Sequence, residues 1–157
     1  MRIYADTSVV GGCYDEEFSG ASLRFFSLVA TGRLLLLISD LVIAELEDAP
    51  PQVQAVISQL PSSVIEHVDL TEEVFALRDA YIEGDVLAPR WLSDAAHVAT
   101  ATVARADAIV SWNFRHIVRL DRMQAYNRIN VARGYAPLTI ITPLEAAPHA
   151  PNDEEEI

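Results

Sequence analysis

The stretch that decides the fold is Met1-Arg-Ile-Tyr-Ala-Asp-Thr-Ser-Val-Val10, at the start of the chain. Its apolar run Ile3-Tyr4-Ala5 predicts a short β-strand, and Asp6 follows directly. In an α/β protein, ligands bind beyond the carboxyl ends of the strands, so a carboxylate at this point is well placed for chemistry. Asp6 could equally cap a turn or a helix with its side-chain oxygen. The choice depends on whether other carboxylates lie beside it.

The rest of the chain alternates strand-like runs with helical patterns. Short apolar runs predict strands at residues 34–38, 107–111 and 138–142, and an alternating pattern predicts another at residues 64–70. Helical spacing, with caps and glycine stops, predicts helices over residues 20–30, 41–48, 51–60, 71–83, 91–106 and 113–132, the last as one or two helices. Residues 11–17 have the composition of an exposed loop. This alternation predicts an α/β fold, a three-layer α/β/α sandwich around a mostly parallel sheet of four to five strands.

The length of 157 residues suits one domain. We assign residues 1–146 to this domain and predict that residues 147–157 form a disordered acidic tail. No apolar run has the roughly 18–20 residues needed to cross a bilayer, and the N-terminus lacks the pattern of a signal peptide. The single cysteine, Cys13, cannot form an internal disulfide. We therefore expect a cytoplasmic protein without membrane contact.

The chain is strongly acidic. Its net charge is −12, from 23 acidic and 11 basic residues, and every basic residue is an arginine. A protein with this charge is a poor general binder of nucleic acid. A nucleic-acid substrate therefore needs a local feature that overcomes the repulsion from this negative charge, and divalent cations held by clustered carboxylates would provide one.

Four polar residues occupy comparable positions at strand ends or helix starts: Asp6, Glu45, Asp94 and Asn113. Each also has an ordinary explanation, since Asp94 can offset a helix dipole, Glu45 can face solvent, and Asn113 can cap the helix after it. Carboxylates that converge repel one another unless a cation joins them. Oxygen ligands without a histidine or cysteine partner favour Mg²⁺ or Mn²⁺ over zinc. Such a site activates water for hydrolysis of phosphate esters, as in nucleases and phosphatases.

Four short motifs follow one another along the chain. They are Tyr4-Ala-Asp-Thr-Ser8, Val42-Ile-Ala-Glu45, Ser93-Asp-Ala-Ala-His-Val-Ala-Thr-Ala101 and Ile109-Val-Ser-Trp-Asn-Phe-Arg-His116. In this order the chain resembles the PIN domain, especially the VapC-type toxins of bacterial toxin–antitoxin pairs, over nearly the whole domain. The resemblance implies a Mg²⁺- or Mn²⁺-dependent endoribonuclease that cleaves RNA, is often a homodimer, and is silenced by a small antitoxin protein. Asp6, Glu45 and Asp94 match the family's three best-kept acids, whereas Asn113 stands where many members have a fourth acid.

Further candidates would contact the substrate or support the acids. We assign five residues to substrate binding: the hydroxyl residues Thr7, Ser8 and Ser111 and the arginines Arg115 and Arg119. Capping and strand-ladder roles are equally open for the hydroxyl residues. His97 and His116 lie one turn after Asp94 and Asn113, and neither has a partner at zinc-ligand spacing. We therefore expect these histidines to be packed or hydrogen-bonded.

Two other functions stay open. A phosphoaspartyl protein, either a receiver domain or a haloacid-dehalogenase-type phosphatase, also places an aspartate after its first strand. Both need a lysine near the phosphate, and the chain has none. The second alternative is a non-catalytic PIN domain that binds RNA or a protein partner, which Asn113 and the acidic surface favour. Metal-dependent cleavage of RNA separates the catalytic from the binding function.

Overall fold

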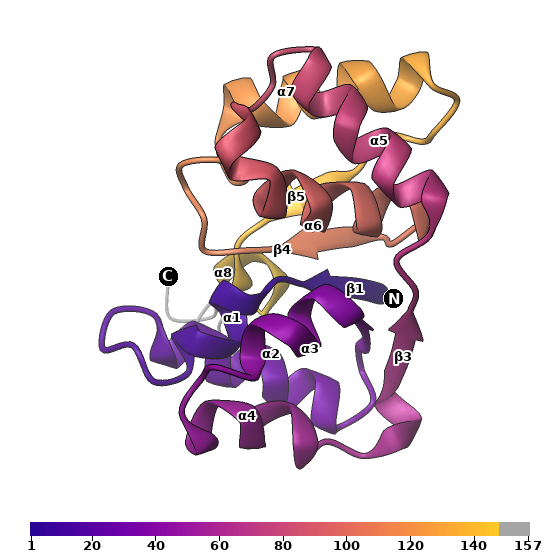
Figure 1. The fold of residues 1–157 in the computed structure, drawn as a ribbon. Helices are drawn as coiled ribbons and strands as arrows, with labels where there is room; N and C mark the ends of the chain where they lie inside the picture. The colour runs from indigo at the N-terminus through magenta and orange to yellow at the C-terminus, as the bar shows by residue number, and fades with distance from the viewer. Residues whose placement is uncertain (148–157) are drawn as a thin grey trace, which may run out of the picture.

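The computed structural model describes residues 1–147, which contain a five-stranded sheet (Figure 1). Its strands are β1 (Arg2–Ala5), β2 (Leu35–Ser39), β3 (Ile65–Val68), β4 (Ala108–Val110) and β5 (Thr139–Ile141). Every neighbouring pair is parallel, and the order across the sheet is β3-β2-β1-β4-β5. The prediction of a mostly parallel sheet of four to five strands is confirmed.

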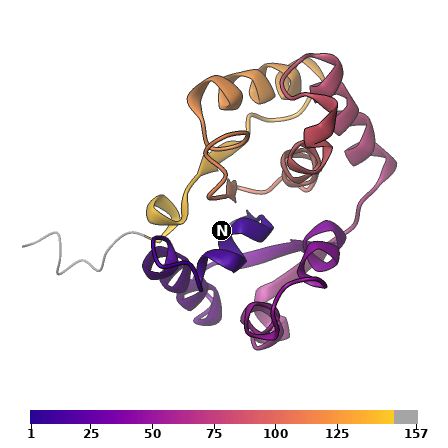
Figure 2. The ribbon, with the colours of Figure 1, turned by 60° about the vertical axis from the view of Figure 1, so that its left-hand side comes forward.

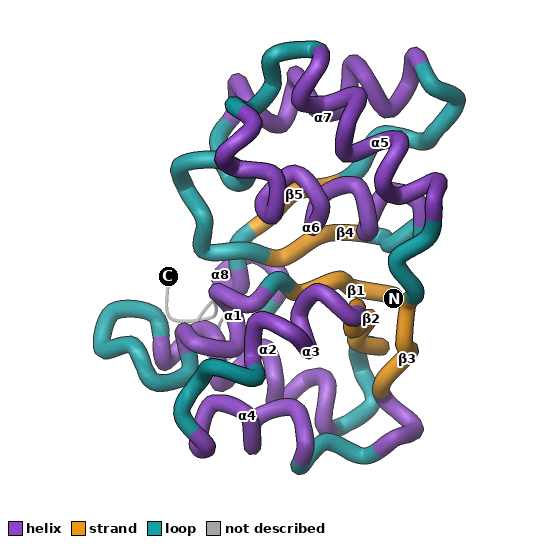
Figure 3. The backbone as a smooth tube through the Cα atoms, viewed as in Figure 1, coloured by secondary structure: helices purple, strands orange, loops and turns teal. Residues whose placement is uncertain are grey.

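Helices cover both faces of this sheet, as Figures 1 and 2 show. One face carries α1 (Thr7–Gly12), α2 (Ser19–Ala30), α3 (Asp40–Leu46) and α4 (Pro51–Ser58). The other face carries α5 (Glu72–Glu83), α6 (Leu92–Val103) and α7 (Leu120–Ala132), and the short α8 (Pro143–Ala146) packs against α2. The 3-10 turns η1 (Ser62–Val64) and η2 (Pro89–Trp91) lead into β3 and α6. Figure 3 shows the resulting helix–sheet–helix layers, so the three-layer α/β/α prediction is also confirmed.

The order of the strands creates a switch point between β1 and β4. From β1 the chain moves to β2 on one side, and it later returns to β4 on the other side. The crevice at such a point, beyond the carboxyl ends of the strands, is the usual ligand site of an open α/β sheet. Asp6 and Ser111 are the first residues after β1 and β4, so they face each other across this crevice.

Helix α6 brings further polar residues to the same edge. All its residues from Ala95 to Thr102 are buried, because small side chains let the helix pack closely against α5 and the sheet. Ala95, Val98 and Ala99, on one side of this helix, are therefore in the core. Its first turns lie at the carboxyl edge of the sheet and carry Asp94 and His97.

No helix in residues 1–147 is long and apolar enough to cross a membrane.

Two local predictions were wrong. The loop predicted from residue 11 begins later, because Gly11 and Gly12 belong to helix α1. The helix predicted from Asn113 begins only at Leu120, and residues 113–119 form turns. Helix α8 was not predicted, and the predicted tail lies outside the described residues except for Ala147.

Candidate active site

Asp6 is a buried carboxylate at the switch point. Only 4% of the residue is exposed, and its oxygens accept hydrogen bonds from Ser8 Oγ to Oδ1 and from Ser111 Oγ to Oδ2, both at 2.5 Å. Burial raises the pKa of Asp6, and the nearby His97 and the two hydroxyl groups offset only part of this rise. A cation beside this carboxylate would stabilise its charged form.

Glu45, on α3, is held by residues at the start of α6. Its Oε1 accepts hydrogen bonds from His97 Nε2 at 2.7 Å and from Ser93 Oγ at 3.1 Å. His97 is buried, and its Nδ1 lies 2.7 Å from the Tyr4 hydroxyl, which in turn lies 2.8 Å from Ser39 Oγ. A carboxylate can only accept, so Nε2 of His97 donates to Glu45. This chain of hydrogen bonds ties β1, β2, α3 and α6 together.

The surroundings of Glu45 favour its charged form. Partial burial raises the pKa of Glu45, but the hydrogen bond and charge of His97 lower it further, so the net pKa is below the usual value. The hydroxyl group of Thr7 is near enough to lower this pKa as well. Its Oγ1 is nevertheless buried without a hydrogen bond of good geometry to any described residue. Thr7 therefore has an unused hydroxyl group next to Glu45.

Asp94 pairs with a histidine from the segment after β4. Its Oδ2 lies 2.7 Å from His116 Nδ1, and this imidazole packs on Trp91 with ring centroids 4.3 Å apart. Asn113 lies on the same segment, but its Oδ1 accepts the backbone N–H groups of Arg115 at 3.2 Å and His116 at 2.9 Å. Asn113 therefore caps its own turn, as the sequence had left open.

The structure places the candidate acids at one edge of the sheet, but it does not bring their carboxylate oxygens together as one ligand set. Among residues 1–147, the carboxylate oxygens of Asp6, Glu45 and Asp94 do not all lie within 4.8 Å of one another. Each acid instead has its own donor: a pair of serines for Asp6, His97 for Glu45 and His116 for Asp94. Both histidines are hydrogen-bonded, as expected.

The chemistry of this donor set suits a hard divalent cation. Three carboxylates at one edge offer oxygen ligands, and the buried Asp6 lacks a positive partner among its direct hydrogen bonds. His97 and His116 contact Glu45 and Asp94, as residues outside the ligand set of a metal site often do to orient its carboxylates. Binding of a metal by Asp6, Glu45, Asp94 and Asn113 stays a prediction.

The predicted substrate-binding residues have different roles in the structure. Ser8 and Ser111 each donate to Asp6 and accept a backbone N–H at 2.9 Å, so they position the acid. Arg115 and Arg119 are both exposed. The guanidinium group of Arg119 pairs with Asp121 at 2.7 Å, which leaves Arg115 as the more available phosphate contact.

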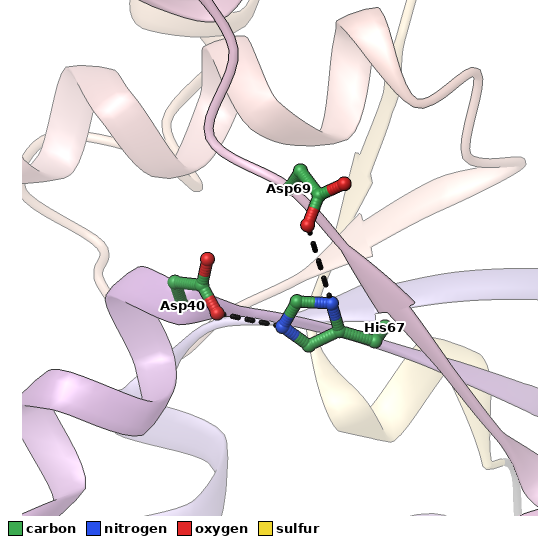
Figure 4. Close-up of side chains that lie close together, drawn as sticks. All are labelled: Asp40, His67 and Asp69. Carbon is green, nitrogen blue, oxygen red and sulfur yellow. Dashed lines mark hydrogen bonds and ion pairs between the residues drawn. The ribbon is translucent and has the colours of Figure 1, made fainter.

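A second acidic group lies at the ends of β2 and β3, and Figure 4 shows it. Nε2 of His67 is 2.6 Å from Asp40 Oδ1, and its Nδ1 is 3.5 Å from Asp69 Oδ1. The ligand atoms of this group do lie within 4.8 Å of one another, and all three residues are exposed. Because the two carboxylates face opposite nitrogens of one ring, the contacts of His67 link α3 to β3. Sequence reasoning missed it because only the β2–β3 register, Ile38 to His67, brings these residues together.

Sequence reasoning also missed three residues that support the acids: Tyr4, Ser39 and Ser93. Ser39 and Ser93 had a signal, since Ser39 directly follows a predicted strand and Ser93 precedes Asp94. Tyr4 had none, because an aromatic residue in a buried strand is explained by packing alone. Its hydroxyl group gains a role only when α6 packs over β1.

The parallel sheet, the two helical layers and the acidic carboxyl edge together define a PIN-like α/β/α domain. Solved structures share this fold. A structure of VapBC2 from Rickettsia felis, bound to a DNA fragment from their promoter, matches with a TM-score of 0.58 and 16% identity, over 90% of this chain and 98% of that chain. The sarcin–ricin-loop-cleaving toxin VapC20 of Mycobacterium tuberculosis matches with a TM-score of 0.52 and 16% identity, over 87% of this chain and 98% of that chain.

No family model and no curated protein matches the sequence. At 16% identity, the likeness to the two structures shows the fold alone. The predicted resemblance to VapC-type PIN domains is thus confirmed for the fold.

Proposed function

We propose that this chain is a Mg²⁺- or Mn²⁺-dependent endoribonuclease and the toxin of a toxin–antitoxin pair. The observation that carries the proposal is that a fold shared with VapC structures holds Asp6, Glu45 and Asp94 at one edge of its sheet. One of the two similar structures is a toxin that cleaves the sarcin–ricin loop. The rival phosphoaspartyl chemistry lacks its lysine.

In this proposal Asp6, Glu45 and Asp94 hold the metal, with the amide oxygen of Asn113 as a fourth candidate ligand. A bound divalent ion activates water and stabilises charge on the phosphate. The chain's own residues fix the ligands before substrate arrives: the serines hold Asp6, and His97 holds Glu45. Such outer hydrogen bonds typically change metal affinity or activity by about 10–100-fold.

On the substrate side of the site, the hydroxyl group of Thr7 is buried beside Glu45, and Arg115 is exposed on the segment that carries Asn113. Both can donate to a phosphate oxygen, and an arginine can do so through two parallel bonds. We assign Arg119 a weaker contact, since Asp121 competes for its guanidinium group.

We further propose that a small antitoxin protein silences the site. The similar VapBC2 structure is named for a pair of proteins. In a chain with a net charge of −12 and no lysine, an acidic site invites a cationic side chain from another protein. An antitoxin segment that inserts Arg or Lys near Asp6 and Asp94 would displace the metal, and a complex that leaves the site open would contradict this. A homodimer is also expected, and sedimentation tests it.

The central experiment is cleavage of an RNA panel with Mg²⁺, with Mn²⁺ and with chelator. Asp94→Asn keeps the side-chain shape and removes the charge, so it should lower metal-dependent cleavage by at least about a hundredfold. Asp79→Asn is the matched control, since Asp79 is an exposed acid on α5 outside the site. Equal cleavage by parent and Asp94→Asn, or cleavage that survives chelator, would refute the mechanism.

A non-catalytic RNA- or protein-binding module is the second candidate function. It is favoured by Asn113, whose side-chain oxygen is already used by its own turn. Binding of RNA without cleavage under every metal condition would support this function.

A further inference from the structure

An aromatic pocket lies beside the candidate site, near the place where α8 packs against α2. Its volume is about 390 Å³, and its lining includes Glu17, Phe18, Arg24, Trp112, Phe114 and Leu144. Phe18 stacks on Trp112 with ring centroids 4.3 Å apart and planes 19° apart. Phe114 lies 6.3 Å from the first ring and 6.2 Å from the second, and 49% of it is exposed. The pocket therefore has room for a small planar group and an aromatic ring open to solvent.

The inner wall of this pocket is fixed by polar contacts. Trp112 Nε1 donates to Ser22 Oγ at 2.9 Å, and Ser22 Oγ donates to the carbonyl of Val9 at 2.9 Å. Gly12 leaves the space that this arrangement needs, since a Cβ there would lie 2.7 Å from Trp112 Nε1 and 2.6 Å from Ser22 Oγ. The indole ring is thus held in one orientation before any ligand binds, which lowers the entropic cost of binding.

The same segment builds the pocket and the candidate site. The backbone N–H of Trp112 donates to Ser8 Oγ at 2.9 Å, and Ser8 Oγ donates to Asp6 at 2.5 Å. The neighbouring residue Ser111 donates to the other oxygen of Asp6. A polymer with one unit at Asp6 would therefore have an adjacent unit close to the aromatic pocket.

The pocket also contains a cation. The Arg24 guanidinium group lies close to Gly20, with Nη1 3.5 Å from the position of a Cβ at that glycine. Arg24 Nε is buried and has no hydrogen-bond partner within residues 1–147. In a chain with a net charge of −12, a pocket lined by an arginine and three aromatic side chains favours a ligand that is both planar and anionic.

We propose that this pocket binds an unpaired nucleobase of single-stranded RNA, next to the phosphodiester at the candidate site. The proposal rests on the ribonuclease function proposed above and assigns the base next to the cleaved phosphodiester to this pocket. Bases of single strands stack on aromatic side chains whatever their sequence, whereas bases inside a duplex are covered by their neighbours. An arginine next to such rings can contact the base or its phosphate.

The test uses a single-stranded oligoribonucleotide that contains 2-aminopurine, whose fluorescence falls when the base stacks on an aromatic ring. The full-length chain carries Asp94→Asn, so that the RNA stays intact, and Mg²⁺ is present. We expect quenching on binding, and Phe114→Ala should weaken binding about tenfold and reduce the quenching. Phe114→Tyr keeps an aromatic face and should bind as the parent does.

Phe75→Ala is the matched control. Phe75 is 37% exposed on α5, and the guanidinium carbon of Arg78 lies 4.8 Å from its ring, so it is a similar aromatic–arginine pair outside the pocket. It should leave RNA binding unchanged. The base pocket is overturned if Phe114→Ala binds like the parent, if the same RNA binds equally well as a duplex, or if the parent does not bind it.

Cleavage by chains that keep Asp94 is measured in parallel and separates the two proposals. If Phe114→Ala and the parent cleave and bind RNA equally well, the base-pocket proposal is refuted and the ribonuclease proposal is unaffected. If RNA binding depends on Phe114 but no chain cleaves RNA, the base-pocket proposal is supported and the ribonuclease proposal is refuted. A Phe114→Ala chain that loses only binding to a protein partner would assign the pocket to that partner.

Discussion

Asp6→Asn should make the metal-free protein more stable. Asp6 is 4% exposed, and burial raises its pKa above the usual 3.8. A carboxyl group whose folded pKa is raised contributes stability below its unfolded pKa and loses it as the pH rises through the folded pKa. Above that folded pKa the parent therefore carries a charge that the fold disfavours. Asparagine keeps the shape and removes that charge.

The magnitude follows from two opposing changes. Asparagine can still accept a hydrogen bond from one serine, but its amide group faces the other, whose hydroxyl hydrogen loses its acceptor. That loss costs about 1 kcal/mol. Removing a buried ion without a positive partner gains about 3 kcal/mol, since the penalty for burying an ion is several kcal/mol. The net gain of about 2 kcal/mol corresponds to a rise in Tm of about 4–8 °C for a domain of this size.

Thermal melts in chelator measure the stability of the metal-free protein, and melts with Mn²⁺ or Mg²⁺ measure the stabilisation by the ion. An ion at a hundred times its dissociation constant stabilises the folded parent by about 2.7 kcal/mol, or about 5–11 °C in Tm. Asp6→Asn should lose most of this metal-induced rise. Its Tm advantage in chelator should also shrink as the pH falls toward 3.8, where the parent carboxyl group becomes protonated.

Asp40→Asn is the matched control, because Asp40 belongs to the other acidic group on the same sheet edge. It should keep the full metal-induced rise in Tm and lose at most about 1 kcal/mol of stability from an exposed ion pair. If Asp40→Asn abolishes the rise and Asp6→Asn does not, the metal binds at the wrong place for this mechanism. A lower Tm for Asp6→Asn in chelator would refute the account of its burial.

Three further predictions concern the same region. Gly12→Ala should lower stability by about 1–3 kcal/mol, because its Cβ would lie 2.6 Å from Ser22 Oγ, whereas Gly11→Ala meets nothing within 4 Å and should be neutral or stabilising in thermal melts. Cys13 is buried, which raises the pKa of its thiol to about 11, so a thiol reagent at pH 8 should modify the folded chain far more slowly than the denatured chain; equal rates would contradict its burial. Asn113→Asp should keep its turn and lower the Mg²⁺ concentration for half-maximal RNA cleavage, and an unchanged Mg²⁺ requirement would leave Asn113 as a cap alone.

The centre of the sheet was predictable because β1, β2 and β4 are short, mostly apolar runs that are buried on both faces. The run Leu34–Ile38 has no polar residue, and such a pattern fits a central parallel strand.

The first turns after a strand were less predictable. Residues 7–12 form a helix although two of them are glycines, which lower helix propensity by about 1 kcal/mol each. Packing of Val9 and Val10 in the core overrides this local preference.

The candidate acids were predictable from their positions, and their hydrogen-bond partners were not. Asp6 follows a recognisable strand, and Asp94 opens a recognisable helix. The contact between Glu45 and His97, however, joins residues that are 52 positions apart in the chain. It depends on how α3 and α6, on opposite faces of the sheet, reach over its carboxyl edge. Sequence periodicity describes each helix separately, so it carries no information on such a meeting.

The pairing of each acid with its own donor reduces the repulsion between the carboxylates at this edge. Carboxylates forced together would repel, but the hydrogen bond from His97 holds Glu45 and the contact with His116 holds Asp94, each on a different element. Asp6 is the exception, since the side chains that donate to it are neutral serines and burial raises its pKa. An ion that enters this edge would therefore gain most from Asp6, while Glu45 and Asp94 would have to share their oxygens between the ion and an imidazole. The energetic centre of the candidate site is thus the aspartate that ends the first strand, and the histidines set how far the other two acids can turn toward it.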